Sequence, residues 1–292
     1  MPADAQGYEH IFLRHFFINF NYITTMKNSE QKKGFGSLFT AIVIPLLLVI
    51  AILLFKFVFG DPSHFQGGNP ENAPIPGDFF GIIYKGGFIV PILMTLLMMV
   101  LTFTMERFFT ITRAKGKGSA VNFLKSFKQN LAAGNLDAAN ADCAKQRGAL
   151  ANVCASVLRT YRVVEADKVM TKEQKMVALQ KDVEEATSLE LPTLEQNLVI
   201  LATISSIATL MGLLGTVIGM IRAFAALANA GAPDSVALSS GISEALINTA
   251  FGIGTAALAI IFYNFFTTQI DKITYNIDEA GYSIVQTFNE KH

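Results

Sequence analysis

The stretch Leu198–Ile221 reads LVILATISSIATLMGLLGTVIGMI and contains no charged residue. An α-helix needs about 20 predominantly apolar residues to cross the hydrocarbon core of a bilayer. This stretch is long enough, and its helical pattern continues to Ala228, before the turn residues Gly231 and Pro233. The sequence therefore predicts a transmembrane helix over 198–228, and the rest of the chain is organised around it.

Three further stretches, 38–59, 88–109 and 239–268, are apolar and long enough to span a membrane. The composition agrees, because 51% of the 292 residues are hydrophobic and only 16% are charged. A soluble domain carries about a quarter charged residues. We therefore predict an all-α integral membrane protein with four transmembrane helices.

Basic residues predict which side each connection faces, since Lys and Arg are enriched in cytoplasmic loops. The loops 60–87 and 229–238 carry one base between them, Lys85, and we predict that both are external. Bases gather before the first span and after the second, at Lys27, Lys32, Lys33, Arg107, Arg113, Lys115, Lys117, Lys125 and Lys128. The segments predicted to be cytoplasmic are the N-terminal segment 1–37, the helical domain 110–197 and the C-terminal helix or tail 269–292.

The domain 110–197 is predicted to hold four helices. Apolar residues at helical spacing indicate the first, and a break at Gly134 ends it. The next two are expected over about 136–146 and 149–166. Thr171 with Gln174 forms a capping-box signal for the fourth, which is expected to run to Pro192 and then into the third span.

The stretch 1–25 differs from the rest of the chain. It has mixed charges and several Phe, and it resembles neither a signal peptide nor a membrane span. Met26, followed by Lys27, is the expected natural initiator.

Residues that usually carry enzyme chemistry are sparse. Basic and acidic residues balance at 23 each, so no net charge favours nucleic acid. His10 and His15 lie in the N-terminal stretch, and no metal-ligand cluster, phosphate loop or nucleophile motif is visible. Cys143 and Cys154 are predicted to be free thiols. We predict a protein that is not an enzyme and that needs no cofactor or metal.

A stripe of small and hydroxylated residues follows one face of the third span, with spacings of three and four. Its members are Ser205, Thr209, Gly212, Thr216, Gly219 and Ala223. Such a stripe is typical of close packing between membrane helices. It is also compatible with a hydroxyl-lined pathway for ions or water, and the sequence leaves both interpretations open.

The fourth span carries an acid, Glu244, with Asn248 one turn later on the same face. An acidic residue at membrane depth indicates an ion or proton site. Counting back about 20 residues from the aromatic cluster at Phe262–Phe266 places Glu244 near the outer boundary, where it could simply reach water. Both interpretations stay open at this point.

Two blocks of sequence resemble the TolQ/ExbB/MotA family of proton-channel subunits. The first is Gly212–Gly219 (GLLGTVIG), and the second is Gly241–Leu246 (GISEAL), followed by Thr249 and Tyr263-Asn264. The pair Glu106-Arg107 resembles the family's segment after its first core helix. Because ExbB and TolQ carry the glutamate and MotA generally does not, the resemblance is closest to ExbB and TolQ.

The resemblance implies a ring of identical subunits, usually a pentamer, around the single membrane helices of an ExbD- or TolR-like partner. It also implies that Thr216, Glu244 and Thr249 line a proton path across a bacterial inner membrane, so the external loops would be periplasmic. Proton flow would act on a TonB- or TolA-like protein that spans the periplasm. The expected partners are therefore other copies of the chain, these two proteins and membrane lipids, with no nucleic acid.

Several features depart from the family pattern. Thr209 and Leu258 stand where members often have proline, and the span 38–59 is additional to the three-helix pattern. Glu244 and Thr249 are five residues apart, which separates them by about 140° on an ideal helix. Arg222 lies outside the small-residue face, and we expect it to reach the outer headgroups.

Two other functions stay open. One is a stator of another ion-driven motor (flagellar, gliding or defence) that uses protons or Na⁺. The other is a non-conducting membrane scaffold, in which the small-residue stripe only packs helices.

Overall fold

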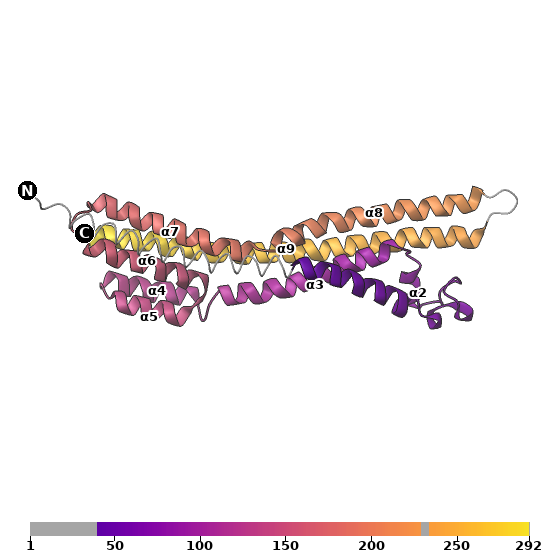
Figure 1. The fold of residues 1–292 in the computed structure, drawn as a ribbon, viewed down its shortest axis with the longest axis horizontal. Coiled ribbons are helices and arrows are strands. Elements are labelled where there is room, and N and C mark those ends of the chain that lie inside the picture. Colours follow the sequence, from indigo (N-terminus) through magenta and orange to yellow (C-terminus); the bar gives the residue numbers. More distant parts are fainter. Residues whose placement is uncertain (1–39, 229–233, 292) are drawn as a thin grey trace, which may run out of the picture. The chain divides into compact units, whose positions relative to one another are not determined.

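The computed structural model describes residues 40–228 and 234–291 (Figure 1). The predictions for 1–37, including its two histidines and the initiator Met26, fall outside the described residues. Residues 229–233 of the predicted loop 229–238 also fall outside them. The first compact unit, Met1–Leu46, contributes only the helical residues 40–46, and everything below concerns the second unit, Leu47–His292.

All regular elements in the described residues are helices, apart from an isolated bridge between Phe65 and Pro74. Four of the helices are long and apolar enough to cross a membrane. The prediction of an all-helical, multi-pass membrane protein is therefore confirmed.

The first membrane-length helix is Thr40–Phe59, whose last turn is the π-helical η1 (Phe55–Phe59). Two 3₁₀ turns follow, η2 (Pro62–His64) and η3 (Gln66–Gly68). The other helices are α2 (Phe79–Tyr84), α3 (Ile89–Ala114), α4 (Ala120–Ala132), α5 (Leu136–Gln146), α6 (Gly148–Ala166), α7 (Lys172–Glu195), α8 (Leu198–Ala228) and α9 (Ser235–Lys291).

Helices α8 and α9 lie side by side and antiparallel (Figure 1), and they meet through small residues. A Cβ added to Gly219 would lie 2.7 Å from the carbonyl oxygen of Gly241. A Cβ added to Gly252 would lie 2.8 Å from the Cα of Gly212. There is no space for side chains at these points, so the two backbones are in direct contact, as in small-xxx-small helix pairs.

The second half of α9 forms the core of a helical bundle with α4, α6 and α7, while α5 packs on α4 and α6. Ile277 and Phe288 of α9 are buried there, and the Phe288 ring meets Tyr161 of α6 edge-on at 5.1 Å. Burial raises the pKa of Tyr161 to about 12, with a smaller contribution from the charge of Glu165. Cys143 and Cys154 are buried in this bundle as free thiols, as predicted.

The junction between α7 and α8 differs from the prediction. The helix was expected to run to Pro192 and then into the third span, whereas α7 continues past Pro192 to Glu195. The chain turns instead at Asn197, whose φ is 64°. Asparagine tolerates this left-handed conformation better than most residues, so Asn197 rather than the proline separates the two helices.

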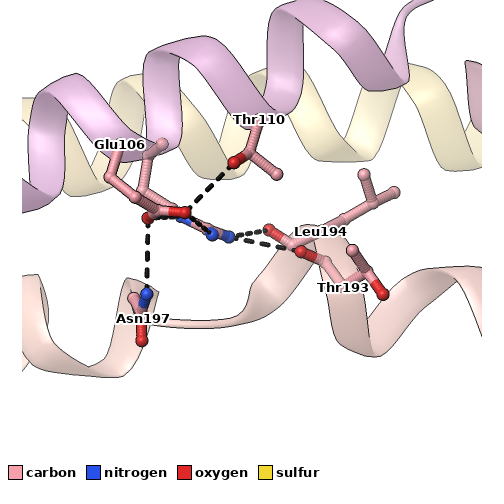
Figure 2. Close-up of polar contacts among 6 residues, drawn as sticks. Glu106, Thr110, Thr193, Leu194 and Asn197 are labelled. Carbon is pink, nitrogen blue, oxygen red and sulfur yellow. Dashed lines mark hydrogen bonds and ion pairs between the residues drawn. The ribbon is translucent and has the colours of Figure 1, made fainter. Parts of the chain in front are cut away.

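A polar cluster from α3 holds this junction (Figure 2). The last carbonyl groups of a helix have no partner within it. Here Arg107 Nη1 donates to the carbonyl oxygens of Leu194, at 3.1 Å, and Thr193, at 3.3 Å. Arg107 also binds both carboxylate oxygens of Glu106, which accepts a hydrogen bond from Asn197 Nδ2. The end of the second span is thus fastened to the turn that leads into α8.

We expect Gly252→Ala to lower the thermal unfolding midpoint of the protein in detergent, because its Cβ would also lie 2.6 Å from the carbonyl oxygen of Ala208. Overpacking of this kind costs about 1–3 kcal/mol. Gly254→Ala is the matched control on the same helix, since nothing lies within 4 Å of its added Cβ. Equal midpoints for the two variants would show that the close approach does not matter for stability.

We expect Arg107→Met to destabilise the protein by about 3 kcal/mol, because it leaves the Glu106 carboxylate and two helix-end carbonyls without their partner. Arg113→Met, an exposed position on the same helix, should change stability by less than about 0.5 kcal/mol. Thermal unfolding followed by circular dichroism compares the two, and similar losses in both would contradict the role of the cluster.

Candidate ion-pathway site

The buried face of α9 carries three polar side chains where it packs against α8. Glu244, Asn248 and Thr255 are all buried, and they are four and seven residues apart. These spacings put them on one face of the helix. A polar stripe inside an apolar helix pair is costly unless its groups find partners or serve a function.

Glu244 is buried rather than open to water, and its carboxylate has two neighbours. Arg222 Nη1 donates to Oε1 at 2.7 Å and to Oε2 at 2.8 Å. On another side lies Gly87, in the turn between α2 and α3, where an added Cβ would lie 2.5 Å from Oε1. Arg222 was expected to reach the outer headgroups and had no predicted partner; half of its side chain is exposed, and it pairs with the acid.

Asn248 continues the site one turn along α9. Its Nδ2 donates to the carbonyl oxygen of Gly86 at 2.9 Å. The side chain occupies the space that a Cβ on Gly215 would need, since that Cβ would lie 2.4 Å from Asn248 Cβ. Within the described residues, Asn248 Oδ1 and Thr255 Oγ1 are buried without a hydrogen-bond partner. The stripe therefore holds an acid and two uncommitted polar atoms.

Thr216 and Thr249 are brought together, because their hydroxyl groups form a hydrogen bond between α8 and α9. Each hydroxyl also lies within hydrogen-bond distance of the carbonyl of the preceding turn, that of Gly212 or Ala245. Because a hydroxyl has one hydrogen, one threonine donates to the other while that other donates to its carbonyl. Both threonines are half-buried at the edge of the helix interface. Glu244 and Thr249 thus have different partners and do not meet in one contact.

The remaining predicted residues lie further along α8. Gly212 and Gly219 are buried against α9, whereas Ser205 and Thr209 are half-buried, and the Thr209 hydroxyl donates to the Ser205 carbonyl. Gly219 lies against Gly241 and Ala245, near Glu244 in the chain, whereas Gly212 lies against Gly252. Over 40–228 and 234–291, no three His, Cys, Asp or Glu side chains lie close enough to hold a metal ion.

The turn that covers Glu244 is fixed by the loop before it. Lys85 Nζ donates to the carbonyl oxygens of Pro70, at 2.8 Å, and Glu71, at 3.1 Å. Burial lowers the pKa of Lys85, and the charge of Glu71 opposes this shift. Asp78 caps α2 through the Gly81 amide and binds His64 at 2.8 Å; these two contacts lower the pKa of Asp78. Gly86 and Gly87 are therefore held at a defined position.

Sequence reasoning missed three members of the site: Arg222, Gly86 and Gly87. The sequence did contain a signal for Arg222, because this base and Glu244 lie near the same end of two consecutive spans. The adjacent glycines, of which Gly87 has a φ of 73°, gave no indication that their partner lay on α9.

Comparison with known proteins matches part of the chain to one family. Residues 148–279 match the MotA/TolQ/ExbB proton channel family. The predicted resemblance is confirmed. The matched segment runs from the start of α6 to Glu279 of α9, so it includes Arg222, Glu244, Asn248 and both threonines. Gly86 and Gly87 lie outside it.

Individual relatives match shorter stretches. A biopolymer transport protein, ExbB-like 3, of Synechocystis is 38% identical over 85 residues, which are 28% of this chain and 40% of the relative. The Tol-Pal system protein TolQ of Haemophilus influenzae is 38% identical over 88 residues, 30% and 39% of the two chains. The biopolymer transport protein ExbB of Salmonella typhimurium is 40% identical over 70 residues, 24% and 29%. None of these three matches exceeds 40% of the relative's length.

We expect Gly87→Ala to destabilise the protein more than Gly68→Ala. Both residues have a left-handed backbone, with φ values of 73° and 69°, which costs an alanine about 1–2 kcal/mol. Only the alanine at 87 would also displace the Glu244 carboxylate, since nothing lies within 4 Å of an added Cβ at 68. Thermal unfolding in detergent measures both variants. In a Glu244→Ala background the penalty at 87 should fall to that at 68, and an unchanged penalty would refute the contact.

Proposed function

We propose that the protein is a proton-conducting stator subunit of the ExbB/TolQ type in a bacterial inner membrane. The observation that carries this proposal is the buried Glu244 carboxylate, on the face of α9 that packs against α8, inside the segment that matches the proton channel family. A carboxylate buried between membrane helices is costly to maintain, and its default role is in ion or proton passage.

The polar atoms around Glu244 support a path for protons. Asn248 Oδ1 and Thr255 Oγ1 follow the acid along one face and lack partners among the described residues. Buried polar atoms of this kind bind water, which can relay protons between fixed groups. Thr216 and Thr249 would line the path at the edge of the interface, where their hydroxyl groups already meet. Ser205 and Thr209, with Gly212 and Gly219, would extend or pack the same face.

Assembly would complete the path. Apolar side chains of α8 and α9 are exposed beside the site, among them Leu213, Val217, Leu246 and Ile253. Lipids and neighbouring copies would cover them, and we propose a ring, as a pentamer, around a single-span ExbD- or TolR-like partner. The names of the relatives, biopolymer transport protein ExbB and Tol-Pal system protein TolQ, support work on a TonB- or TolA-like protein in envelope transport or maintenance.

The orientation follows the distribution of Lys and Arg. The helical bundle of α4–α7 would be cytoplasmic, with both termini, and the Glu244 end of α9 would lie near the periplasmic surface. Each proton that crosses gains about 2.3 kcal/mol per 100 mV from the membrane potential. Several protons could therefore drive one mechanical step.

Proton flux into proteoliposomes under an imposed potential tests the proposal, with the protein co-purified with its single-span partner. We expect flux in the wild type and at least a tenfold decrease in Glu244→Gln, because the amide has the shape of the acid but cannot exchange a proton. Glu184→Gln, at an exposed position on α7, is the matched control and should conduct like the wild type.

Equal flux in the wild type and Glu244→Gln would remove the acid from the path. No flux in any of the three proteins, with the partner present, would favour the scaffold. Flux of Na⁺ without protons would assign the subunit to a sodium-driven motor.

A further inference from the structure

The ion pair between Arg222 and Glu244 is strongly asymmetric. The glutamate side chain is 6% exposed, whereas the arginine side chain is 53% exposed. In the single subunit, separation of the pair would therefore leave the arginine exposed and the carboxylate buried. Breaking the contact therefore leaves Glu244, and not Arg222, as the buried charge without a partner.

No second base replaces Arg222 at the carboxylate within the described residues. Arg222 is the one basic side chain there within ion-pair distance of Glu244. Lys85, close to Gly87 in the chain, is directed to the carbonyl oxygens of Pro70 and Glu71. The α2–α3 turn presents Gly87 to the carboxylate, and Asn248 on α9 is directed to Gly86. Among the described residues, the Glu244 carboxylate thus has Arg222 alone as a countercharge.

The contact has a geometry that can be released. Both hydrogen bonds come from one nitrogen, Nη1, at 2.7 and 2.8 Å. The strongest arginine–carboxylate pairs are forks that use two nitrogens in parallel. Arg107, in contrast, binds the two oxygens of Glu106 through two nitrogens and is 1% exposed. Arg222 is therefore the more accessible of the two arginines, and it binds its carboxylate through one nitrogen instead of two.

We propose that Arg222 is a positioning residue that holds Glu244 ionised in the resting subunit, and that its departure is the step that lets the carboxylate take up a proton. This inference rests on the proposed function. A buried carboxylate without a counterion is strongly unfavourable and becomes neutral instead. One proton from the aqueous phase binds one carboxylate oxygen, while the guanidinium keeps its own charge and turns to its exposed side. When the arginine returns, the proton leaves.

Infrared spectroscopy of the full-length protein in liposomes tests this step directly, because a protonated carboxyl has its own C=O band. The band of Glu244 is assigned by its loss in Glu244→Gln. In Arg222→Gln we expect the pH at which this band reaches half its height to rise by about one to three units, since removal of a neighbouring cation favours the neutral acid. Arg222→Lys keeps the charge and should stay close to the wild type. Arg113→Gln, an exposed arginine elsewhere, should have no effect.

The flux assay gives the second readout. In Arg222→Gln the pH of maximal proton flux should move upward in parallel with the infrared band, and Arg222→Lys should restore the wild-type profile. A merely structural arginine would change the amount of active protein without moving either pH value.

The outcomes separate the two proposals. An unchanged infrared midpoint in Arg222→Gln, with wild-type flux intact, overturns the role of Arg222 and leaves the proton path standing. A shifted midpoint in a protein whose wild type does not conduct supports the control of protonation by Arg222 and overturns the proposed function. A midpoint that shifts equally in Arg222→Lys also overturns the inference, because charge would then not be the cause.

Discussion

Direct backbone contact between α8 and α9 is the constraint on which the site depends. Where Gly212 meets Gly252 and Gly219 meets Gly241, the helices are too close for any side chain. A polar residue on this face of α9 therefore fits only where α8 offers a gap. Asn248 fits over Gly215, and Glu244 has the Gly87 turn beside it. The positions of the glycines on α8 thus limit where α9 can bury a polar side chain.

Two glutamate–arginine pairs lie at opposite ends of α8, and their surroundings give them different properties. Arg107 is enclosed, binds Glu106 through two nitrogens and also caps α7, so all its contacts would be lost together. Arg222 is half exposed and uses one nitrogen. Since Arg107 is enclosed whereas Arg222 is exposed on one side, the first pair is suited to fixing a junction and the second to changing state.

The sequence was sufficient for the features that depend on composition and periodicity. Long uncharged stretches predicted the membrane helices, and a run of spacings of three and four predicted the small-residue stripe that includes Gly212 and Gly219. The same periodicity could not reveal that Glu244 is buried, because its cover comes from Gly87 in a distant loop. It also did not reveal that Arg222 pairs with Glu244. A long side chain can reach a neighbour that the helical position of its Cα does not indicate. The end of α7 was also expected at Pro192, because a proline weakens a helix. The helix ends instead near Asn197, which adopts a left-handed backbone.

The continuity of α9 has a mechanical consequence. One uninterrupted helix carries Glu244 near its start and Ile277 and Phe288 in the core of the bundle. Helix α8, which carries Arg222, is separated from α7 by the turn at Asn197. A change in the contact between Arg222 and Glu244 alters the force between α9, which is continuous, and α8, which is joined to α7 by a turn. Because packed helices resist deformation along their length, such a displacement would be absorbed at the joint. That joint is where the Glu106–Arg107 cluster fastens the second span, so the ion pair and the cluster act on the same helix from its two ends.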